Sequence, residues 1–293
     1  MEKISRVRQA LVVTGITSLV LASTVVAGAS SIGAYNAAAA KLVPPVFKKM
    51  TIQVATDATY APDESMRGST MVGFDIDLMN AIARTLGIKV HENNVTFDNI
   101  IAGIKSGRYQ VGNSSFTDTK AREKQVNFVD YFQAGEGVYA KSGTKVSFTG
   151  LKSFCGLKVA VETGTVEQSD AQTTQKSCPS SKKLVVLAFP TQTEANTAVL
   201  SGQATVGFLD SQIAGNVVAT SKGRFKLVGH AVNVAPYGIA TAKTAAGHGL
   251  ALAFAAAVKV LMANGTYHAI LNKWGVSAGA VASARVKLNG AIS

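Results

Sequence analysis

The sequence predicts an α/β protein that is built as two lobes, with the chain crossing between them twice. Three observations lead to this prediction: a strand–helix–strand–helix–strand rhythm over residues 50–112, the same rhythm over residues 157–209, and an extended stretch after each unit. Alternating strands and helices are typical of parallel sheets covered by helices. The length of 293 residues by itself fits either two lobes or one large α/β domain.

The N-terminal segment has the layout of an export signal. Basic residues near the start precede residues 9–40, which carry no charge, and small residues offer cleavage after Ala29 or Ala40. We expect residues 1–40 to be a signal peptide. An uncleaved anchor stays an alternative, because about 20 apolar residues would span a bilayer. The protein is therefore expected to be secreted or periplasmic, or tethered to the outer face of the cytoplasmic membrane.

The first unit starts with an extended run at residues 50–56, which predicts a strand. A polar loop over residues 57–70 leads to a helix over residues 74–86, whose apolar residues recur every four positions and which Gly87 ends. The rest of this unit is expected to be a strand at residues 88–91, a helix at 97–106 and a strand at 109–112.

The second unit is expected to contain strands at residues 157–161, 184–188 and 205–209, with helices at 166–176 and 194–201. Extended stretches at 136–141 and 237–241 predict the two crossings, and helices at 249–262 and 266–274 would then return to the first lobe. The first lobe would comprise residues 41–141 and 237–293, and the second lobe residues 142–236. A linker that is crossed twice is a natural hinge.

Charge and cysteine content narrow the classes of function. The net charge is +12, but the basic residues are scattered without an aromatic cluster, so we expect a solvated basic face and no nucleic-acid partner. Cys155 and Cys178 are the two cysteines of the chain, and in an oxidising compartment we expect them to form a disulfide that adds roughly 3 kcal/mol of stability. No metal site is expected, because the four histidines show no ligand spacing with the cysteines.

Five short strings, read together, resemble one family. They are TDATYAP at residues 56–62, VGFDIDL at 72–78, SSFTDTKAR at 114–122, GT at 164–165 and NKWG at 272–275. In order and spacing they are similar to the polar amino-acid-binding proteins of ABC transporters, the bacterial extracellular solute-binding proteins of family 3. The resemblance implies the two-lobed clamp of type II periplasmic binding proteins, a free polar amino acid as ligand, a membrane permease as partner, no cofactor and no catalysis. We expect such a protein to act as a monomer.

The resemblance also implies how the ligand's α-carboxylate is held. Arg122 would bind it, and a guanidinium fork suits a carboxylate; the alternative is a surface arginine that pairs with Glu123 or Asp118. Ser115 and Thr117 lie two apart at a strand end, so both side chains can reach one ligand. Phe116, which lies between these two residues, is also part of the expected site. Gly164 and Thr165 are expected across from them, because the start of a helix has free backbone amides. Thr119 is expected to cap a helix.

The other end of the ligand is assigned by the same resemblance. Asp210 would accept the α-ammonium, although an aspartate before Ser211 is also a common helix cap. Tyr60 and Phe97 would enclose the ligand's side chain, since aromatic faces bury an apolar stem well. Asp57 would contact a distal amine or guanidinium, which favours lysine, arginine, ornithine or histidine. Asp63 departs from the family, which usually carries an apolar or aromatic residue there, so the outer wall of the pocket is expected to differ.

Two other functions stay open. The same fold carries cyclohexadienyl and arogenate dehydratases, and it also serves as the sensor part of membrane receptors. A dehydratase would bind a carboxylated ring, whereas Asp57 and Asp210 favour an ammonium. A sensor would need a membrane span, and beyond Lys41 the apolar run at residues 250–262 is short and contains Lys259. An N-terminal tether would still leave a binding protein as the better interpretation.

Overall fold

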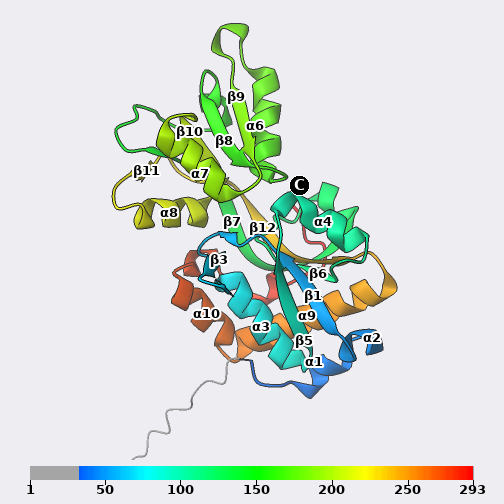
Figure 1. Ribbon diagram of the computed structural model, residues 1–293. Coiled ribbons are helices and arrows are strands. Elements are labelled where there is room, and N and C mark those ends of the chain that lie inside the picture. Colours follow the sequence, from blue (N-terminus) through cyan, green and yellow to red (C-terminus); the bar gives the residue numbers. More distant parts are fainter. Residues whose placement is uncertain (1–32, 293) are drawn as a thin grey trace, which may run out of the picture. The chain divides into compact units, whose positions relative to one another are not determined.

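A computed structural model describes residues 33–292, which fold around one sheet of nine strands. The strand order is β5-β1-β6-β12-β7-β10-β8-β9, and β11 pairs with β7 (Figure 1). The strands are β1 Thr51–Thr56, β5 Lys89–Asn94, β6 Val111–Gly112, β7 Val126–Lys141, β8 Lys158–Glu162, β9 Val185–Phe189, β10 Val206–Asp210, β11 Phe225–Leu227 and β12 Val232–Ala242. The helices are α1 Ala37–Lys41, α2 Pro45–Lys48, α3 Phe74–Leu86, α4 Phe97–Lys105, α5 Lys120–Glu123, α6 Val166–Ser177, α7 Gln192–Ser201, α8 Ser211–Thr220, α9 Ala245–Ala263 and α10 Thr266–Trp274. Short 3-10 helices lie at Leu151–Phe154, Ser180–Lys182, Ser277–Gly279 and Ser283–Arg285.

The expected signal peptide falls mainly on residues 1–32, which lie outside the described residues, as does cleavage after Ala29. Cleavage after Ala40 would cut inside α1, whose Ala39 and Ala40 are buried. The extent of the signal peptide stays a prediction.

The first βαβαβ unit has the predicted order. β1 pairs in parallel with both β5 and β6, so α3 and α4 are the crossover helices. Phe74, Leu78 and Ile82 on α3 are fully buried, as the period of its apolar residues requires. Gly87 ends this helix in the left-handed conformation at φ 66°, where a residue without a side chain is favoured.

The second unit also matches its prediction. β8 pairs in parallel with β9 and β10, and α6, α7 and α8 lie beside these strands (Figure 1). The predicted disulfide between Cys155 and Cys178 is present, and it ties the end of α6 to the segment before β8. Helix α8, which follows Asp210 directly, was not predicted.

Two long strands carry the chain between the units. The predicted crossings at residues 136–141 and 237–241 lie within β7 and β12, which pair antiparallel with each other. β12 also pairs with β6 of the first unit, whereas β7 pairs with β10 of the second. The sheet therefore continues from one unit to the other. The lobe boundaries drawn from the sequence stay a prediction.

The prediction of a polar loop at residues 57–70 is wrong in part. It contains a small antiparallel sheet of β2 Thr59–Tyr60, β3 Glu64–Arg67 and β4 Thr70–Val72. Strands of two to four residues are too short for an alternating apolar pattern. The turn between β3 and β4 contains Gly68 at φ 63°. This small sheet places Tyr60 and Glu64 beside the end of β1.

The C-terminal helices return to the first unit, as predicted. α9 and α10 pack on α3, and Asp77 accepts hydrogen bonds from Lys273 Nζ and Trp274 Nε1 at 2.6 and 2.7 Å. α9 is longer than the predicted helix, and within residues 33–292 it alone has the length and hydropathy of a membrane span. Its residues Phe254 and Leu261 are fully buried in the core of the first unit. The helix therefore packs as a core helix.

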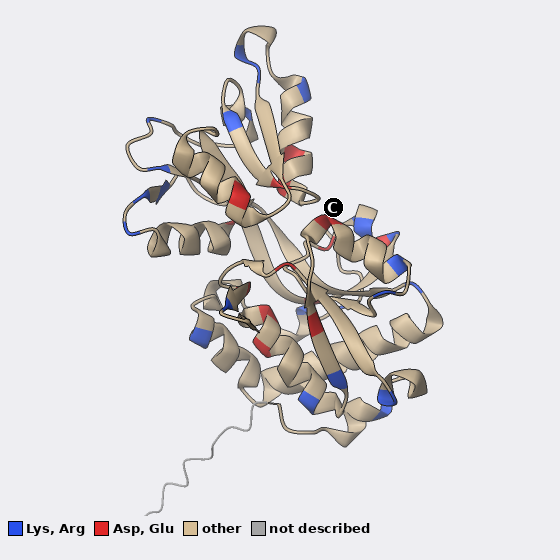
Figure 2. Ribbon diagram, viewed as in Figure 1, with Lys and Arg blue, Asp and Glu red and all other residues tan. Residues whose placement is uncertain are grey.

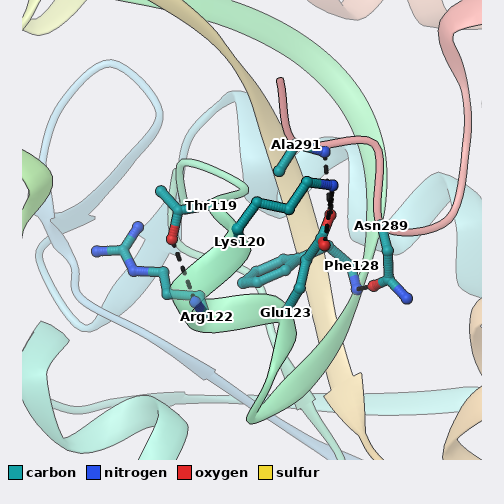
Figure 3. Close-up of polar contacts among 7 residues, drawn as sticks. All are labelled: Thr119, Lys120, Arg122, Glu123, Phe128, Asn289 and Ala291. Carbon is teal, nitrogen blue, oxygen red and sulfur yellow. Dashed lines mark hydrogen bonds and ion pairs between the residues drawn. The ribbon is translucent and has the colours of Figure 1, made fainter. Parts of the chain in front are cut away.

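The C-terminal segment runs along the start of β7 and reaches α5 (Figure 3). Asn289 exchanges hydrogen bonds with the backbone of Phe128, its Oδ1 accepting from the Phe128 amide at 2.8 Å and its own amide donating to the Phe128 carbonyl at 3.0 Å. Further along, the Ala291 amide donates to Glu123 Oε1 at 3.0 Å. Glu123 also pairs with Lys120 at 3.1 Å. These contacts fix the short helix that carries Arg122.

Two buried carboxylates lie next to this segment. Asp118 and Asp130 are 2% and 4% exposed. Burial and mutual repulsion raise the pKa of Asp130 to about 8, and burial raises the pKa of Asp118 to about 6. Because both values lie above those of an unfolded chain, the folded protein binds more protons between pH 4 and pH 8. These groups therefore make the fold less stable as the pH rises through that window.

We expect Asp130→Asn to raise the free energy of unfolding at pH 8.5 by at least about 1 kcal/mol, because a buried repulsive charge is removed. The measurement is urea unfolding between pH 5 and pH 8.5. The stability of the variant should change less with pH than that of the unchanged protein. Asp98→Asn, at an exposed acid, serves as the control. An unchanged pH slope in Asp130→Asn would contradict the prediction.

Candidate functional site

A small cavity lies where the carboxyl ends of β1, β8 and β10 meet the starts of α4 and α6. Sheets of this kind bind ligands at the carboxyl ends of their strands. The lining residues are Asp57, Tyr60, Glu64, Phe97, Ser114, Ser115, Thr117, Arg122, Glu162, Thr165, Val166, Glu167 and Asp210. The cavity brings together all the residues predicted for the site except Phe116 and Gly164. Their role in binding stays a prediction.

Arg122 lies on α5, which Thr119 caps as predicted by accepting from the Arg122 amide at 3.2 Å. The guanidinium donates to the carbonyls of Thr117 at 2.8 Å and Gly164 at 2.9 Å, so it joins the two units. It also lies over the rings of Phe97 and Phe116, 5.4 and 5.3 Å from their centroids. No carboxylate within the described chain pairs with it. A surface ion pair with Glu123 or Asp118 is therefore absent.

The charge on Arg122 is nevertheless maintained. Burial lowers the pKa of the guanidinium, whereas the nearby carboxylates of Glu167 and Asp210 raise it. An arginine keeps its proton under almost all conditions in proteins. The cavity therefore contains one buried, fixed positive charge whose hydrogen bonds are made to neutral carbonyl groups. A carboxylate group of a ligand could therefore pair with this guanidinium, which has no carboxylate partner among the described residues.

Ser115, Phe116 and Thr117 follow β6 but do not continue it as a regular strand, contrary to the predicted strand end. Ser115 and Thr117 line the cavity, whereas Phe116 points away from it and stacks on Phe97 at 4.5 Å between centroids. Ser115 has a positive φ of 48°, and its amide donates to Asp75 Oδ2 at 2.9 Å. Phe116 therefore supports the wall of the cavity instead of lining it.

The departure at Asp63 has a structural explanation. Asp63 is fully buried, and its Oδ2 accepts from Ser115 Oγ at 3.0 Å and from Gln212 Nε2 at 3.0 Å. Gln212 also donates to the hydroxyl oxygen of Tyr237 at 2.7 Å. A polar network thus replaces the expected apolar wall. Because the Ser115 hydroxyl donates its hydrogen to Asp63, the Ser115 oxygen would accept a hydrogen bond from a ligand.

The start of α6 differs from the prediction at one residue. The Gly164 amide was expected to be free for a ligand, but it donates to Gln168 Oε1 at 2.8 Å. The backbone of Gly164 turns at φ 86°, which directs its carbonyl to Arg122. Thr165 lines the cavity and caps the helix by accepting from the Gln168 amide at 3.1 Å. Gly164 therefore holds the arginine rather than offering a donor.

Asp210 ends β10 and is 6% exposed. Although it precedes α8, its side chain makes no capping hydrogen bond. Its Oδ2 instead accepts from the Tyr60 hydroxyl at 2.8 Å, and its amide donates to the same hydroxyl oxygen at 3.1 Å. Burial raises the pKa of Asp210 to about 6, against the lowering effects of Tyr237, Tyr60 and Arg122. The carboxylate faces the cavity from the unit opposite Tyr60.

Acidic side chains predominate among the charged residues that line the cavity. Asp57, Glu64, Glu162, Glu167 and Asp210 line it, with Arg122 as the single basic side chain among the lining residues. Burial raises the pKa of each of these carboxyl groups above its usual value. Figure 2 shows acidic segments at the starts of α4 and α6 and basic segments at their far ends. A cation that enters the cavity would relieve this repulsion.

Sequence reasoning missed Glu64, Glu162 and Glu167. Each of them lies two positions from a string that had been singled out: Glu64 follows Asp63, Glu162 ends the strand before the Gly164 turn, and Glu167 lies in the first turn of α6. The sequence signal that could have identified these three residues is an acidic side chain near each site motif. Within residues 33–292 no cluster of three or more histidine, cysteine or acidic side chains is arranged to hold a metal ion.

Comparison with known proteins gives a consistent picture. Residues 52–277 match the family described as bacterial extracellular solute-binding proteins, family 3. An arginine-binding protein of Corynebacterium glutamicum is 28% identical over 71% of this chain and 68% of its own length. An ancestral arginine-binding protein bound to arginine is similar in structure, with a TM-score of 0.71, 32% identity and coverage of 78% of this chain and 99% of its own. An ancestral amino acid-binding protein, a precursor of cyclohexadienyl dehydratase, has a TM-score of 0.69, 29% identity and coverage of 78% and 97%.

Proposed function

Because the chain belongs to the bacterial extracellular solute-binding proteins of family 3, we propose that it binds a free cationic L-amino acid between its lobes and delivers it to an ABC permease. One observation carries the cationic part of the proposal: five carboxyl groups and one guanidinium line the cavity. A cationic amino acid has two positive groups and one negative group, which complements this imbalance. The relatives named for arginine agree with it.

The proposed roles follow the ends of the ligand. Arg122 would bind the α-carboxylate, with Ser115 and Thr117 beside it and Thr165 across the cavity. Asp210 would bind the α-ammonium. These roles are supported by the positions of Arg122 and Asp210 on opposite units around one cavity.

The distal part of the ligand would lie among Tyr60, Phe97 and Asp57, which line the same cavity. We further propose a monomer that works outside the cytoplasm, either free or held by its N-terminal segment. The two lobes would be residues 41–141 with 237–293, and residues 142–236.

A dehydratase is the second candidate, because one structural relative is a precursor of such an enzyme. That relative is itself an amino acid-binding protein. The acidic cavity would repel a ring substrate that carries two carboxylates. We therefore propose binding without catalysis.

We expect arginine, lysine, ornithine or histidine to raise the unfolding temperature in a thermal-shift screen of amino acids. Such a ligand binds the folded state only, so the rise should grow with the logarithm of its concentration. Glutamate and aspartate should cause no shift. A shift confined to these two acids, or turnover of prephenate or arogenate without saturable amino-acid binding, would exclude the proposed function.

A further inference from the structure

Asp57 and Glu162 line the cavity within hydrogen-bonding reach of each other, and they come from different units of the fold. Asp57 directly follows β1 and Glu162 ends β8, and both are 2% exposed. Each influences the other: after burial, the Asp57 charge is the largest cause that raises the pKa of Glu162, whereas a hydrogen bond with Glu162 lowers the pKa of Asp57. Two carboxyl groups thus share one buried end of the cavity.

Neutral donors hold both groups in place. The Gln192 amide donates to Glu162 Oε1 at 2.9 Å and to Thr59 Oγ1 at 3.2 Å. Thr59 in turn donates to Asp57 Oδ1 through its hydroxyl at 2.7 Å and its amide at 3.0 Å. This chain of hydrogen bonds connects the two carboxyl groups and fixes their orientation.

No basic side chain in the described part of the protein neutralises the pair. Neither carboxyl group has a lysine, arginine or histidine nitrogen within 4.0 Å. Arg122 is held by the carbonyls of Thr117 and Gly164. Two buried carboxylates at one place are costly unless a proton or a cation lies with them. In the free protein the raised pKa of Glu162 favours a proton on that group, and a cation that enters the cavity would replace this proton.

We propose that Asp57 and Glu162 together bind the distal cation of the ligand, which makes Glu162 a specificity-determining residue. This inference rests on the proposed function and deepens it. The resemblance to the family assigns a distal contact to Asp57 alone, whereas Glu162 adds a second carboxylate from the opposite unit. A ligand with a charged side chain holds the two units together at this end, and a neutral ligand leaves the pair without a cation.

The test compares arginine with citrulline, its uncharged analogue of nearly the same shape, by isothermal titration calorimetry on the whole protein. The unchanged protein should prefer arginine by at least about 25-fold, the loss expected when one partner of a buried charge pair is removed. In Glu162→Gln this preference should fall at least about tenfold, because a charged hydrogen bond becomes a neutral one.

Glu167→Gln is the matched control, since it makes the same change on the Asp210 side of the cavity. It should weaken arginine and citrulline alike and leave their ratio unchanged. An equal fall of the ratio in both variants would overturn the inference, as would an unchanged ratio in Glu162→Gln. If Glu162→Gln does not fold, the unchanged protein decides: equal affinity for arginine and citrulline overturns the inference. Absence of any amino-acid binding would instead overturn the proposed function.

Discussion

Replacing Arg122 by alanine should weaken the binding of arginine at least about 25-fold, the loss expected for one partner of a buried charge pair. In the free protein the guanidinium donates to two neutral carbonyls and lies over two aromatic rings. Its charge therefore has no carboxylate partner among residues 33–292 until a ligand provides one. Alanine removes both the charge and the contact with Gly164 that joins the two units.

The loss can be assigned to the α-carboxylate by changing the ligand as well as the protein. Decarboxylated arginine lacks the group that Arg122 is proposed to bind, so its affinity should change much less in Arg122→Ala than that of arginine. This is the logic of a double-mutant cycle. Arg122→Lys keeps the charge but not the planar fork, and it should bind with intermediate affinity.

A different result would show that Arg122 has another role. If Arg122→Ala weakened arginine and its decarboxylated analogue equally, the side chain would act by holding α5 against the Gly164 turn. Thermal unfolding of the free variant separates this outcome from a general loss of structure, because the latter would lower the unfolding temperature without ligand.

The order of strands and helices was predictable because it depends on local patterns. The apolar period of α3, the left-handed glycine at Gly87 and the extended runs that became β1 and β8 are each visible within a dozen residues. The small sheet of β2, β3 and β4 was not, because its strands are short. Its polar residues are buried by neighbours that lie far away in the sequence.

The composition of the cavity was less predictable than its location. Asp63 contacts Ser115 and Gln212, which are 52 and 149 positions away, so nothing local marks it as buried. Asp210 had two local interpretations, helix cap and ligand contact, and only the hydrogen bond from Tyr60 shows that the carboxylate does not cap α8. The resemblance supplied the remaining site residues, but it gave no indication of Glu162.

Replacing Asp210 by asparagine should also weaken arginine binding at least about 25-fold, since it removes the charge proposed to pair with the α-ammonium. Asparagine has nearly the same shape, and its amide oxygen can still accept from the Tyr60 hydroxyl, which holds Asp210 at 2.8 Å. A loss of affinity would then report the charge. An analogue of arginine without the α-amino group should bind both proteins with similar affinity.

The same residue predicts a pH dependence. In the free protein the pKa of Asp210 is raised to about 6, and a bound ammonium would lower it, so the complex holds fewer protons than the free protein. Affinity for arginine should therefore be highest above pH 6 and should fall as the pH decreases through this value. The raised pKa values of Glu162 and Glu167 act in the same direction and add to this fall.

Asp210→Asn separates these contributions. Calorimetry between pH 5 and pH 8 should give a shallower decline in the variant than in the unchanged protein, because Asp210 no longer takes up a proton. Affinity that rises as the pH falls would contradict the sign of this linkage. If affinity declined equally with falling pH in the two proteins, Asp210 would not bind the ammonium. The positive charge of the ligand would then be recognised only by the carboxylates on the Glu162 side.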